Sequence, residues 1–267
     1  MLLKRLLAHP LTRGLDIDDP STTSRRRAII ESKPFLKRIY QEWYETISGH
    51  LPDIDGPVLE LGSGAGFLSR YVPRLITSEI FNCPGIQVVL DGQALPIAME
   101  SLRAIVMTDV LHHVPDPRRF FREAARCLRV GGRILLIEPW VSRWSRIVYT
   151  HLHHEPFQPD SRDWTIPLNG PLSGANGAMP WIIFERDIEQ FAAAFPRLKV
   201  ELVQPFMPFR YLVSGGVSLR TLMPNTTFRL WRSLEAAMAK HMRTWAMFAL
   251  IVISHVGQNG IRAIKRI

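Results

Sequence analysis

The sequence predicts an α/β fold, in which helices cover both faces of one doubly wound, mostly parallel sheet of seven strands. From Val58 onward, short apolar segments alternate with segments of helical periodicity, which is typical of parallel strands joined by helices. The first apolar segment leads into the glycine-rich turn VLELGSGAGF, residues 58–67, and acidic residues follow several later ones. With 267 residues, 46% of them hydrophobic, the chain can bury the core that such a sheet needs.

Residues 1–52 are predicted to form a helical extension before the sheet. An apolar face near its start suits either a packed helix or contact with a membrane surface, and it consists of Leu2, Leu3, Leu6 and Leu7. Ser21 or Thr22 is suited to cap a helix that begins near Ser24. A second helix is expected over residues 34–48, where apolar side chains recur at helical spacing: Phe35, Ile39, Trp43 and Ile47.

The main domain is predicted over residues 53–256, followed by a tail, 257–267. Its expected strands are 58–61, 75–79, 87–90, 102–108, 133–137, 198–203 and 246–253. Helices are expected over 67–72, 117–128 and 182–195, with Gly131 and Gly132 ending the second. The connection between the second and third strands is short, so the usual helix there is shortened. Residues 140–180 and 205–243 are irregular, and we expect two insertions that shape a binding site.

Four acidic residues lie at or just beyond the ends of successive predicted strands: Glu79, Asp91, Asp109 and Glu138. Ligands of open α/β sheets bind outside the carboxyl ends of the strands. One acid in such a position would mean little. Four of them beside a glycine-rich turn predict a lined cleft.

The glycine-rich turn predicts a cofactor that lies close to the backbone, because glycine has no Cβ and tolerates positive φ. Dinucleotide sites favour the spacing G-x-G-x-x-G. Here the glycines are Gly62, Gly64 and Gly66, and Phe67 stands where the third glycine of a dinucleotide site would be. The spacing therefore disfavours a nicotinamide cofactor.

Composition narrows the partners and the compartment. The net charge of +9 and the pI near 10.1 favour anionic partners in general, while the basic run at 25–27 is interpreted as the solvated start of a helix. The two cysteines, Cys83 and Cys127, form neither a metal-binding spacing nor a disulfide framework. The N-terminus is too short and broken for a secretory signal. We expect a cytoplasmic protein, with contact at a membrane surface as an open alternative.

In this order, the motifs resemble class I S-adenosylmethionine-dependent methyltransferases, in particular the broad type 11 group that acts on small molecules. The resemblance covers residues 58–138. It rests on E-x-G-x-G-x-G at 60–66, the acid Glu79, DGQALP from Asp91, TDVLHHV at 108–114 and LRVGG at 128–132. It implies a Rossmann-like fold and S-adenosylmethionine as the cofactor.

The resemblance also implies roles for the glycine turn. The backbone of Gly62, Gly64 and Gly66 would run beside the methionine part of the cofactor, and Glu60 would order its amino group. Glu79 stands where the family's ribose-binding acid falls. A carboxylate suits a vicinal diol because its oxygens accept both hydroxyl hydrogens.

The remaining implied cofactor residues follow the later strands. Asp91 matches the position that takes the adenine amino group, and Gly92 or Gln93 could present a backbone amide to the ring. Phe81 is suited to pack on adenine. Asp109 and Leu111 would border the methyl-donor end.

Methyl transfer from a sulfonium is an in-line displacement, and it needs a general base only when the acceptor is a weak acid. The candidate bases are His112, His113 and Glu138, together with the cluster His151, His153, His154 and Glu155. The histidine pair is also suited to fixing a loop, and the cluster to lining a lid. Because adjacent ligands rarely converge on one ion and no distant Cys or His pattern supports them, we expect no metal site.

The sequence thus predicts methyl transfer to an O, N or C atom of a small-molecule or lipid-like acceptor, with an anionic one favoured. Arg210 and Arg220 would suit a phosphate or carboxylate on it, unless they are unpaired surface residues. A non-catalytic cofactor-binding protein and a nicotinamide-dependent reductase are the alternatives. We expect no nucleic-acid partner, because no N/D-P-P-Y/F motif follows the fourth strand.

Overall fold

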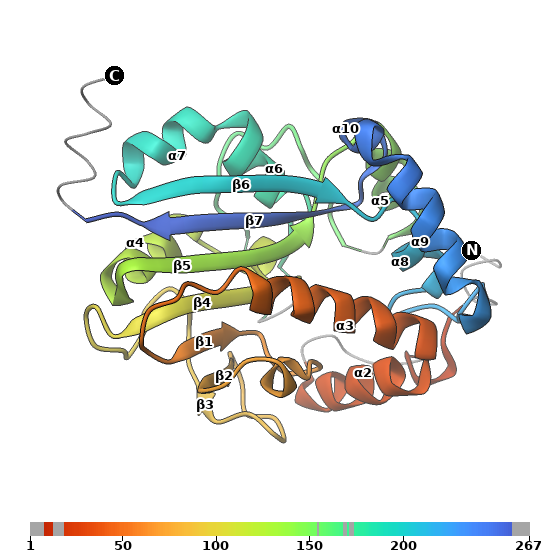
Figure 1. Ribbon diagram of the computed structural model, residues 1–267, viewed down its shortest axis with the longest axis horizontal. Helices are drawn as coiled ribbons and strands as arrows, with labels where there is room; N and C mark the ends of the chain where they lie inside the picture. Colours follow the sequence, from red (N-terminus) through yellow and green to blue (C-terminus); the bar gives the residue numbers. More distant parts are fainter. Residues whose placement is uncertain (1–7, 13–18, 154, 168–169, 171–173, 258–267) are drawn as a thin grey trace.

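The computed structural model describes residues 8–12, 19–153, 155–167, 170 and 174–257. Its strands are β1 (Val58–Leu61), β2 (Leu75–Glu79), β3 (Val88–Val89), β4 (Leu102–Thr108), β5 (Leu128–Pro139), β6 (Leu198–Phe206) and β7 (Phe248–His255). They form one seven-stranded sheet in the order β3-β2-β1-β4-β5-β7-β6 (Figure 1). Strands β1 to β5 pair in parallel, and β7 is antiparallel to both of its neighbours. The predicted doubly wound, mostly parallel sheet is confirmed.

The helices complete two layers around the sheet. They are α2 (Pro20–Ser32), α3 (Pro34–Gly49), α4 (Pro117–Cys127), α5 (Arg143–Leu152), α6 (Met179–Trp181), α7 (Ile188–Ala194), α8 (Arg210–Ser214), α9 (Phe228–Ala237) and α10 (Met242–Trp245). Side chains along β4 alternate between two cores, because successive residues of a strand face opposite sides. Ile105 and Met107 pack with α4 and α7, whereas Ala104 and Val106 pack with α3.

Helix α3 is the main cover of one sheet face (Figure 1). Its apolar positions recur at helical spacing and are buried, and they include a run of aromatic rings. Trp43 is 1% exposed and lies against Phe248 of β7, with ring centroids 5.1 Å apart. The predicted helix over 34–48 is therefore confirmed, and it packs directly on the sheet.

The predicted helix over 67–72 is wrong. That segment contains only a 3₁₀ turn, Leu68–Arg70. Two physical reasons account for the difference. Pro73 disfavours helical backbone at the residue before it, and the space is occupied by α3, whose Tyr44 ring lies 4.9 Å from the ring of Phe67. The glycine turn is consequently not followed by the N-terminus of an α-helix.

Other element boundaries also differ from the predictions. Helix α2 begins at Pro20 rather than near Ser24, because the Asp19 side chain accepts a hydrogen bond from the Ser21 backbone N–H at 2.8 Å. Gly131 does not end a helix, since α4 stops at Cys127 and Gly131 lies inside β5, where the pairing with β4 shifts register. Its φ of +82° requires glycine there.

The predicted helix over 182–195 is two segments. Residues Ile182–Arg186 are π-helical, with the Asp187 N–H bonded to the Ile182 carbonyl oxygen at 2.8 Å, and α7 follows. Strand β3 is shorter than predicted, β6 is longer, and β7 begins two residues later. Within the described residues, no helix is long and apolar enough to cross a membrane. The predicted apolar face at Leu2 to Leu7 lies outside them.

Candidate active site

A cavity of about 420 Å³ opens at the carboxyl ends of β1, β2 and β4. Of the ten cofactor residues predicted from the sequence, it is lined by Glu60, Gly62, Gly66, Glu79, Asp91, Gly92 and Asp109. The parallel pairing of β1 with β2 and β4 brings these residues together, because the strands end at the same edge.

The glycine turn is shaped by close contacts. Gly62 has a φ of +71°, and a Cβ on it would clash with Val110. Gly64 lies outside the cavity wall, but its N–H donates to Glu79 Oε1 at 2.9 Å, and a Cβ there would meet that same oxygen at 2.5 Å. Glycine at 64 therefore lets β2 and the turn lock together through Glu79.

Three carboxyl groups facing the cavity have raised pKa values. Glu60 is 3% exposed, and burial raises its pKa to about 7, with the nearby Glu79 adding to the effect. Burial likewise raises the pKa of Glu79, against two backbone N–H bonds that lower it. Desolvation raises the pKa of Asp109 to about 6. We call Glu60, Glu79, Asp91 and the glycine turn the cofactor end of the cavity.

Asp91 is held by its neighbour Gln93. Asp91 Oδ1 accepts the Gln93 backbone N–H at 2.8 Å, and Gln93 Oε1 in turn accepts the N–H of Asp116 at 3.1 Å. The turn after β3 is thereby tied to the start of α4. Gly92 lies between them on the cavity wall.

Besides Gly64, two predicted cofactor residues lie off the cavity wall. Leu111 is fully buried in the apolar core, since the 3₁₀ turn Leu111–His113 directs it beneath the cavity. Phe81 is not among the lining residues, and Ile80 lines the cavity beside Glu79. The shortened connection after β2, which contains no helix, accounts for this difference.

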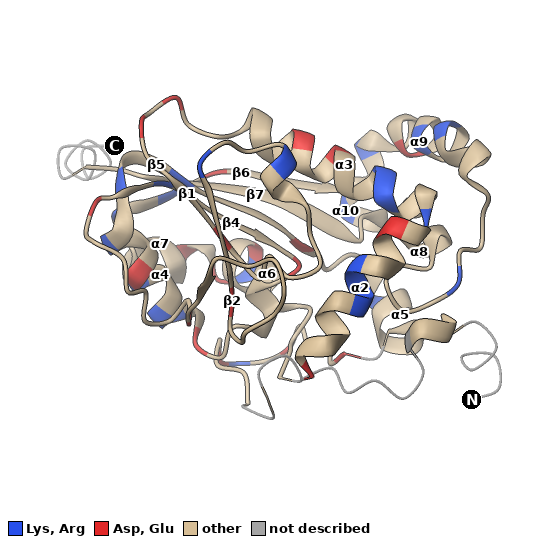
Figure 2. Cartoon of the chain, turned by 90° about the horizontal axis from the view of Figure 1, so that it is seen from below, with Lys and Arg blue, Asp and Glu red and all other residues tan. Residues whose placement is uncertain are grey.

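Side chains of the N-terminal helices line the cavity, which was not predicted from the sequence. Thr23 and Arg26 of α2 and Tyr40 and Tyr44 of α3 all do so. Arg27 Nη2 donates to the Gly66 carbonyl oxygen at 2.8 Å. The basic run of α2 (Figure 2) is thus not only a solvated helix start. Local sequence periodicity could not predict the contact between Arg27 and Gly66, because these residues are far apart in the sequence.

Beside the cavity lies a buried group that we call the histidine cluster: His112, His113, Glu138 and Glu155. Glu138 Oε1 accepts the N–H groups of Val110 and Leu111 at 2.9 and 2.7 Å, which fixes the 3₁₀ turn. Its Oε2 lies 2.7 Å from His112 Nδ1. Both side chains are almost fully buried, so neither reaches the cavity.

His113 is the member of the cluster that lines the cavity. Its Nδ1 lies 3.2 Å from the Gly174 carbonyl oxygen. Burial, followed by the neighbouring charge of His112, lowers the pKa of His113 to about 3. Burial would also lower the pKa of His112, but Glu138 and Glu155 outweigh it and raise that pKa well above its usual value.

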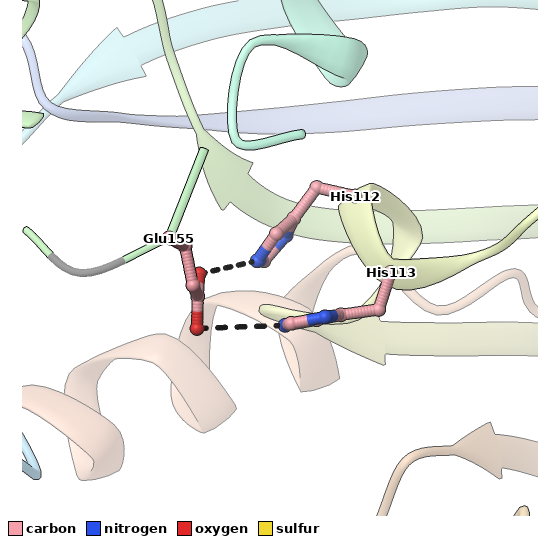
Figure 3. A group of neighbouring side chains, drawn as sticks. All are labelled: His112, His113 and Glu155. Atoms are coloured by element: carbon pink, nitrogen blue, oxygen red, sulfur yellow. Dashed lines mark ion pairs between the residues drawn. The ribbon is translucent and has the colours of Figure 1, made fainter. Parts of the chain in front are cut away.

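The first insertion covers the histidine cluster. Glu155 points toward both histidines (Figure 3), and the Asn176 N–H donates to the His112 carbonyl oxygen at 2.9 Å. The segment 151–155 contains the other histidines predicted as candidate bases. His151 is exposed on α5, His153 Nδ1 lies 3.8 Å from Glu155 Oε2, and His154 lies outside the described residues.

The second insertion contributes Val217 to the cavity. The expectation that Arg210 would face an anionic acceptor is wrong, because this side chain is 7% exposed and pairs with Glu42 and Glu235. It ties α8 to α3 and α9 instead. Arg220 is exposed and does not line the cavity.

Comparisons with known proteins agree with this geometry. Residues 59–136 match the family model described as a methyltransferase domain. An uncharacterised protein of Methanocaldococcus jannaschii is 28% identical over 37% of this chain, and the match spans about half, 51%, of that relative's length. Over residues 59–136, the chain thus resembles a methyltransferase domain of the type 11 group.

Solved structures support the same fold. Geranyl diphosphate C-methyltransferase from Streptomyces coelicolor aligns with a TM-score of 0.50 at 14% identity, covering 94% of this chain and 89% of that one. A Haloferax volcanii complex of the Trm112 activator with a putative methyltransferase gives a TM-score of 0.50 at 14% identity, covering 91% and 100%. At such low identity these likenesses concern the fold alone.

The residues present fit S-adenosylmethionine, which is cationic at its sulfur and amino group. The pKa values of Glu60, Glu79 and Asp109 are raised because burial outweighs the nearby basic side chains, and a cationic ligand would offset that cost of burying the charged carboxylates. Thr108 Oγ1 is also buried at the cavity without a hydrogen-bond partner among the described residues. Buried polar groups of this kind usually meet a ligand or water.

Proposed function

We propose that the protein transfers the methyl group of S-adenosylmethionine to an O, N or C atom of a small-molecule acceptor, with lipid-like and anionic molecules included in that class. The observation that carries the proposal is the convergence of Glu60, Glu79, Asp91 and the glycine turn on one cavity. When bound, the cofactor supplies an electrophilic methyl group on a sulfonium.

The chain's own residues would hold the two ends of this cofactor. Glu79 would accept hydrogen bonds from the ribose hydroxyls with the carboxylate oxygens that also bind the Gly64 and Ile80 N–H groups. Asp91 would accept one from the adenine amino group. Glu60 would hold the methionyl amino group, and Arg26 is the cationic side chain on the described cavity wall that suits the methionyl carboxylate.

The acceptor would occupy the part of the cavity beside Asp109 and His113. Tyr40, Val114 and Val217 give this part an apolar lining, which suits a small organic or lipid-like molecule. Of the two polar groups, Asp109 is the better proton acceptor, because a base works best when its pKa lies near the working pH. The pKa of Asp109 is about 6 and that of His113 about 3.

Backbone geometry also supports Asp109. Its φ of +63° is uncommon for a residue with a side chain, and such strain concentrates at functional sites. Of the candidate bases from the sequence, His112 and Glu138 are then positioning residues, since neither lies on the cavity wall. His113, which lines the cavity, would contact the acceptor, and His112 and Glu138 would act on the acceptor only by fixing the turn that carries His113.

Calorimetric titration of the purified chain with S-adenosylhomocysteine tests the proposal, with NADH titrated in parallel. We expect S-adenosylhomocysteine to bind, Asp91→Ala to weaken that binding at least about tenfold through loss of one hydrogen bond to the ligand, and NADH not to bind. The control is Glu45→Gln, an exposed acid of α3. Binding of NADH without S-adenosylhomocysteine would refute the proposal.

Transfer itself is tested with radiolabelled S-adenosylmethionine and fractionated small-molecule and lipid extracts. Label should appear in an acceptor fraction with the wild-type chain and be lost with Asp109→Asn, while cofactor binding by that variant persists. Cofactor binding without transfer to any fraction would favour the non-catalytic alternative.

A further inference from the structure

The fold brings His112 and His113 against Glu155, a residue far from them in the sequence (Figure 3). The histidines come from the 3₁₀ turn after β4, and Glu155 follows α5. One ligand atom from each side chain lies within 4.8 Å of the other two. No metal site is expected here from the sequence, because adjacent ligands rarely converge on one ion and no distant Cys or His pattern supports them.

The second nitrogen of each imidazole is already engaged. His112 Nδ1 lies 2.7 Å from Glu138 Oε2, and His113 Nδ1 lies 3.2 Å from the Gly174 carbonyl oxygen. Both partners are pure acceptors, so each Nδ1 carries the proton in these contacts. When both imidazoles are neutral with the proton on Nδ1, both Nε2 lone pairs face Glu155.

This arrangement places three acceptor groups around one point. His112 Nε2 lies 3.4 Å from Glu155 Oε2, and His113 Nε2 lies 3.8 Å from Glu155 Oε1. Lone pairs and a carboxylate repel one another unless a cation lies between them. Ligands at about 2.1 Å from Zn²⁺ in a tetrahedron are separated by about 3.4 Å. The distance from His112 Nε2 to Glu155 already matches this value, whereas the other separations, which lie within 4.8 Å, would have to shorten when an ion binds.

We propose that His112 Nε2, His113 Nε2 and the Glu155 carboxylate bind one divalent transition-metal ion, of the type represented by Zn²⁺. Two imidazoles and one carboxylate suit zinc and its neighbours rather than Mg²⁺, which favours oxygen ligands. Glu138 and the Gly174 carbonyl oxygen would orient the rings from behind, as acceptors commonly do for metal-bound histidines.

The proposed metal site borders the cavity, so a bound ion could contact a molecule there. His113 lines the cavity, and a three-ligand set leaves one tetrahedral position for water or an oxygen of a bound acceptor. An ion there would lower the pKa of a coordinated hydroxyl. Metal binding itself does not depend on the proposed methyl transfer.

An imidazolium at His112 is the competing account, because a proton on Nε2 would satisfy Glu155 without a metal. The two accounts differ in one measurable property. A protonated pair retains no ion after exhaustive dialysis, whereas a built site takes up one equivalent. The test is therefore metal stoichiometry, independent of any acceptor.

The full chain is stripped with a chelator, dialysed and titrated with Zn²⁺ by calorimetry and with Co²⁺ by visible absorption. We expect one ion per chain and a Co²⁺ spectrum typical of tetrahedral coordination. Glu155→Gln and His113→Asn should each weaken binding at least about 100-fold, because each removes a direct ligand, whose loss exceeds that of an outer-shell partner. Zn²⁺ binding should raise the thermal midpoint of the wild type and not of these variants.

The matched control is His151→Asn, in the same histidine-rich segment but exposed on α5, which should bind as the wild type does. Circular dichroism and S-adenosylhomocysteine titration report whether each variant folds. No stoichiometric uptake by the wild type, or equal loss in the control, overturns the metal site. Failure to bind S-adenosylhomocysteine would overturn the proposed function and leave the metal result standing.

Discussion

The cofactor end of the cavity and the histidine cluster shift the pKa values of their buried carboxyl groups in opposite directions. At the cofactor end, burial raises the pKa of Glu60 to about 7, and within the described residues no basic side chain forms an ion pair with it. In the cluster, burial also opposes the charge of Glu155, but His112 and His113 outweigh it and lower that pKa. Carboxyl groups with raised pKa values thus face the cavity, where the proposed cationic cofactor would bind, and Glu155, with a lowered pKa, lies in the supporting histidine cluster.

The largest effect is expected at Glu138, the most deeply buried support. Glu138→Ala would leave His112 and two N–H groups without their acceptor. Breaking a buried, hydrogen-bonded charge pair costs about 3–5 kcal/mol. Urea unfolding should show a loss of that order, and a loss below about 1 kcal/mol would mean that Glu138 is not the support described.

The substitution Glu60→Gln should raise the free energy of unfolding at high pH, whereas Glu138→Ala should lower it. The folded pKa of Glu60 is about 7 and the ordinary value 4.5, so its favourable protonated state is fully available below pH 4.5 and lost as pH rises through 7. The charged form then costs about 3 kcal/mol. We expect the variant to be more stable than the wild type at pH 8 and similar at pH 4.5, as measured by urea unfolding at both pH values.

The same variant should bind S-adenosylhomocysteine more weakly at pH 8. Glu45→Gln, whose parent side chain is exposed, is the control for both measurements. If Glu60→Gln leaves the pH dependence of the unfolding free energy unchanged, the raised pKa of Glu60 is wrong.

Glu79→Gln tests the cofactor end through binding. The amide keeps one acceptor oxygen but loses the charge and sets an N–H₂ group against the Gly64 or Ile80 N–H. A loss of about 2.7 kcal/mol corresponds to about 100-fold weaker S-adenosylhomocysteine binding. Calorimetric titration measures it, and an unchanged affinity would remove Glu79 from the cofactor site.

The smallest effect is expected at Thr108, whose Oγ1 is buried and has no hydrogen-bond partner in the part of the chain that the structure describes. Thr108→Val removes an unsatisfied hydroxyl at similar volume, so the free protein should gain about 1 kcal/mol. S-adenosylhomocysteine binding should weaken a few-fold if the ligand supplies the missing partner. Thermal unfolding without ligand measures the change in stability, and unfolding with S-adenosylhomocysteine measures the change in binding. A free variant less stable than the wild type would contradict the expected gain in stability.

The strands and most of the cofactor end were predictable because they are local. A buried parallel strand is a continuous apolar run, and the acid at its end is adjacent in sequence, as at Leu75–Glu79. The contacts that could not be predicted from the sequence join residues that are far apart along the chain. Arg27 with Gly66, and Glu155 with His112, depend on how α2 and the first insertion pack. The missing helix after β1 is of the same kind, since α3 fills its place.

The place of β7 has a consequence for synthesis on the ribosome. Strand β6 pairs only with β7 among the described strands, and β7 also completes the pairing of β5. Until residues 248–255 leave the exit tunnel, the nascent chain has a free edge at β5 and an isolated β6. Both would be open to non-native pairing, so loss of residues 248–255 would leave two strand edges unpaired.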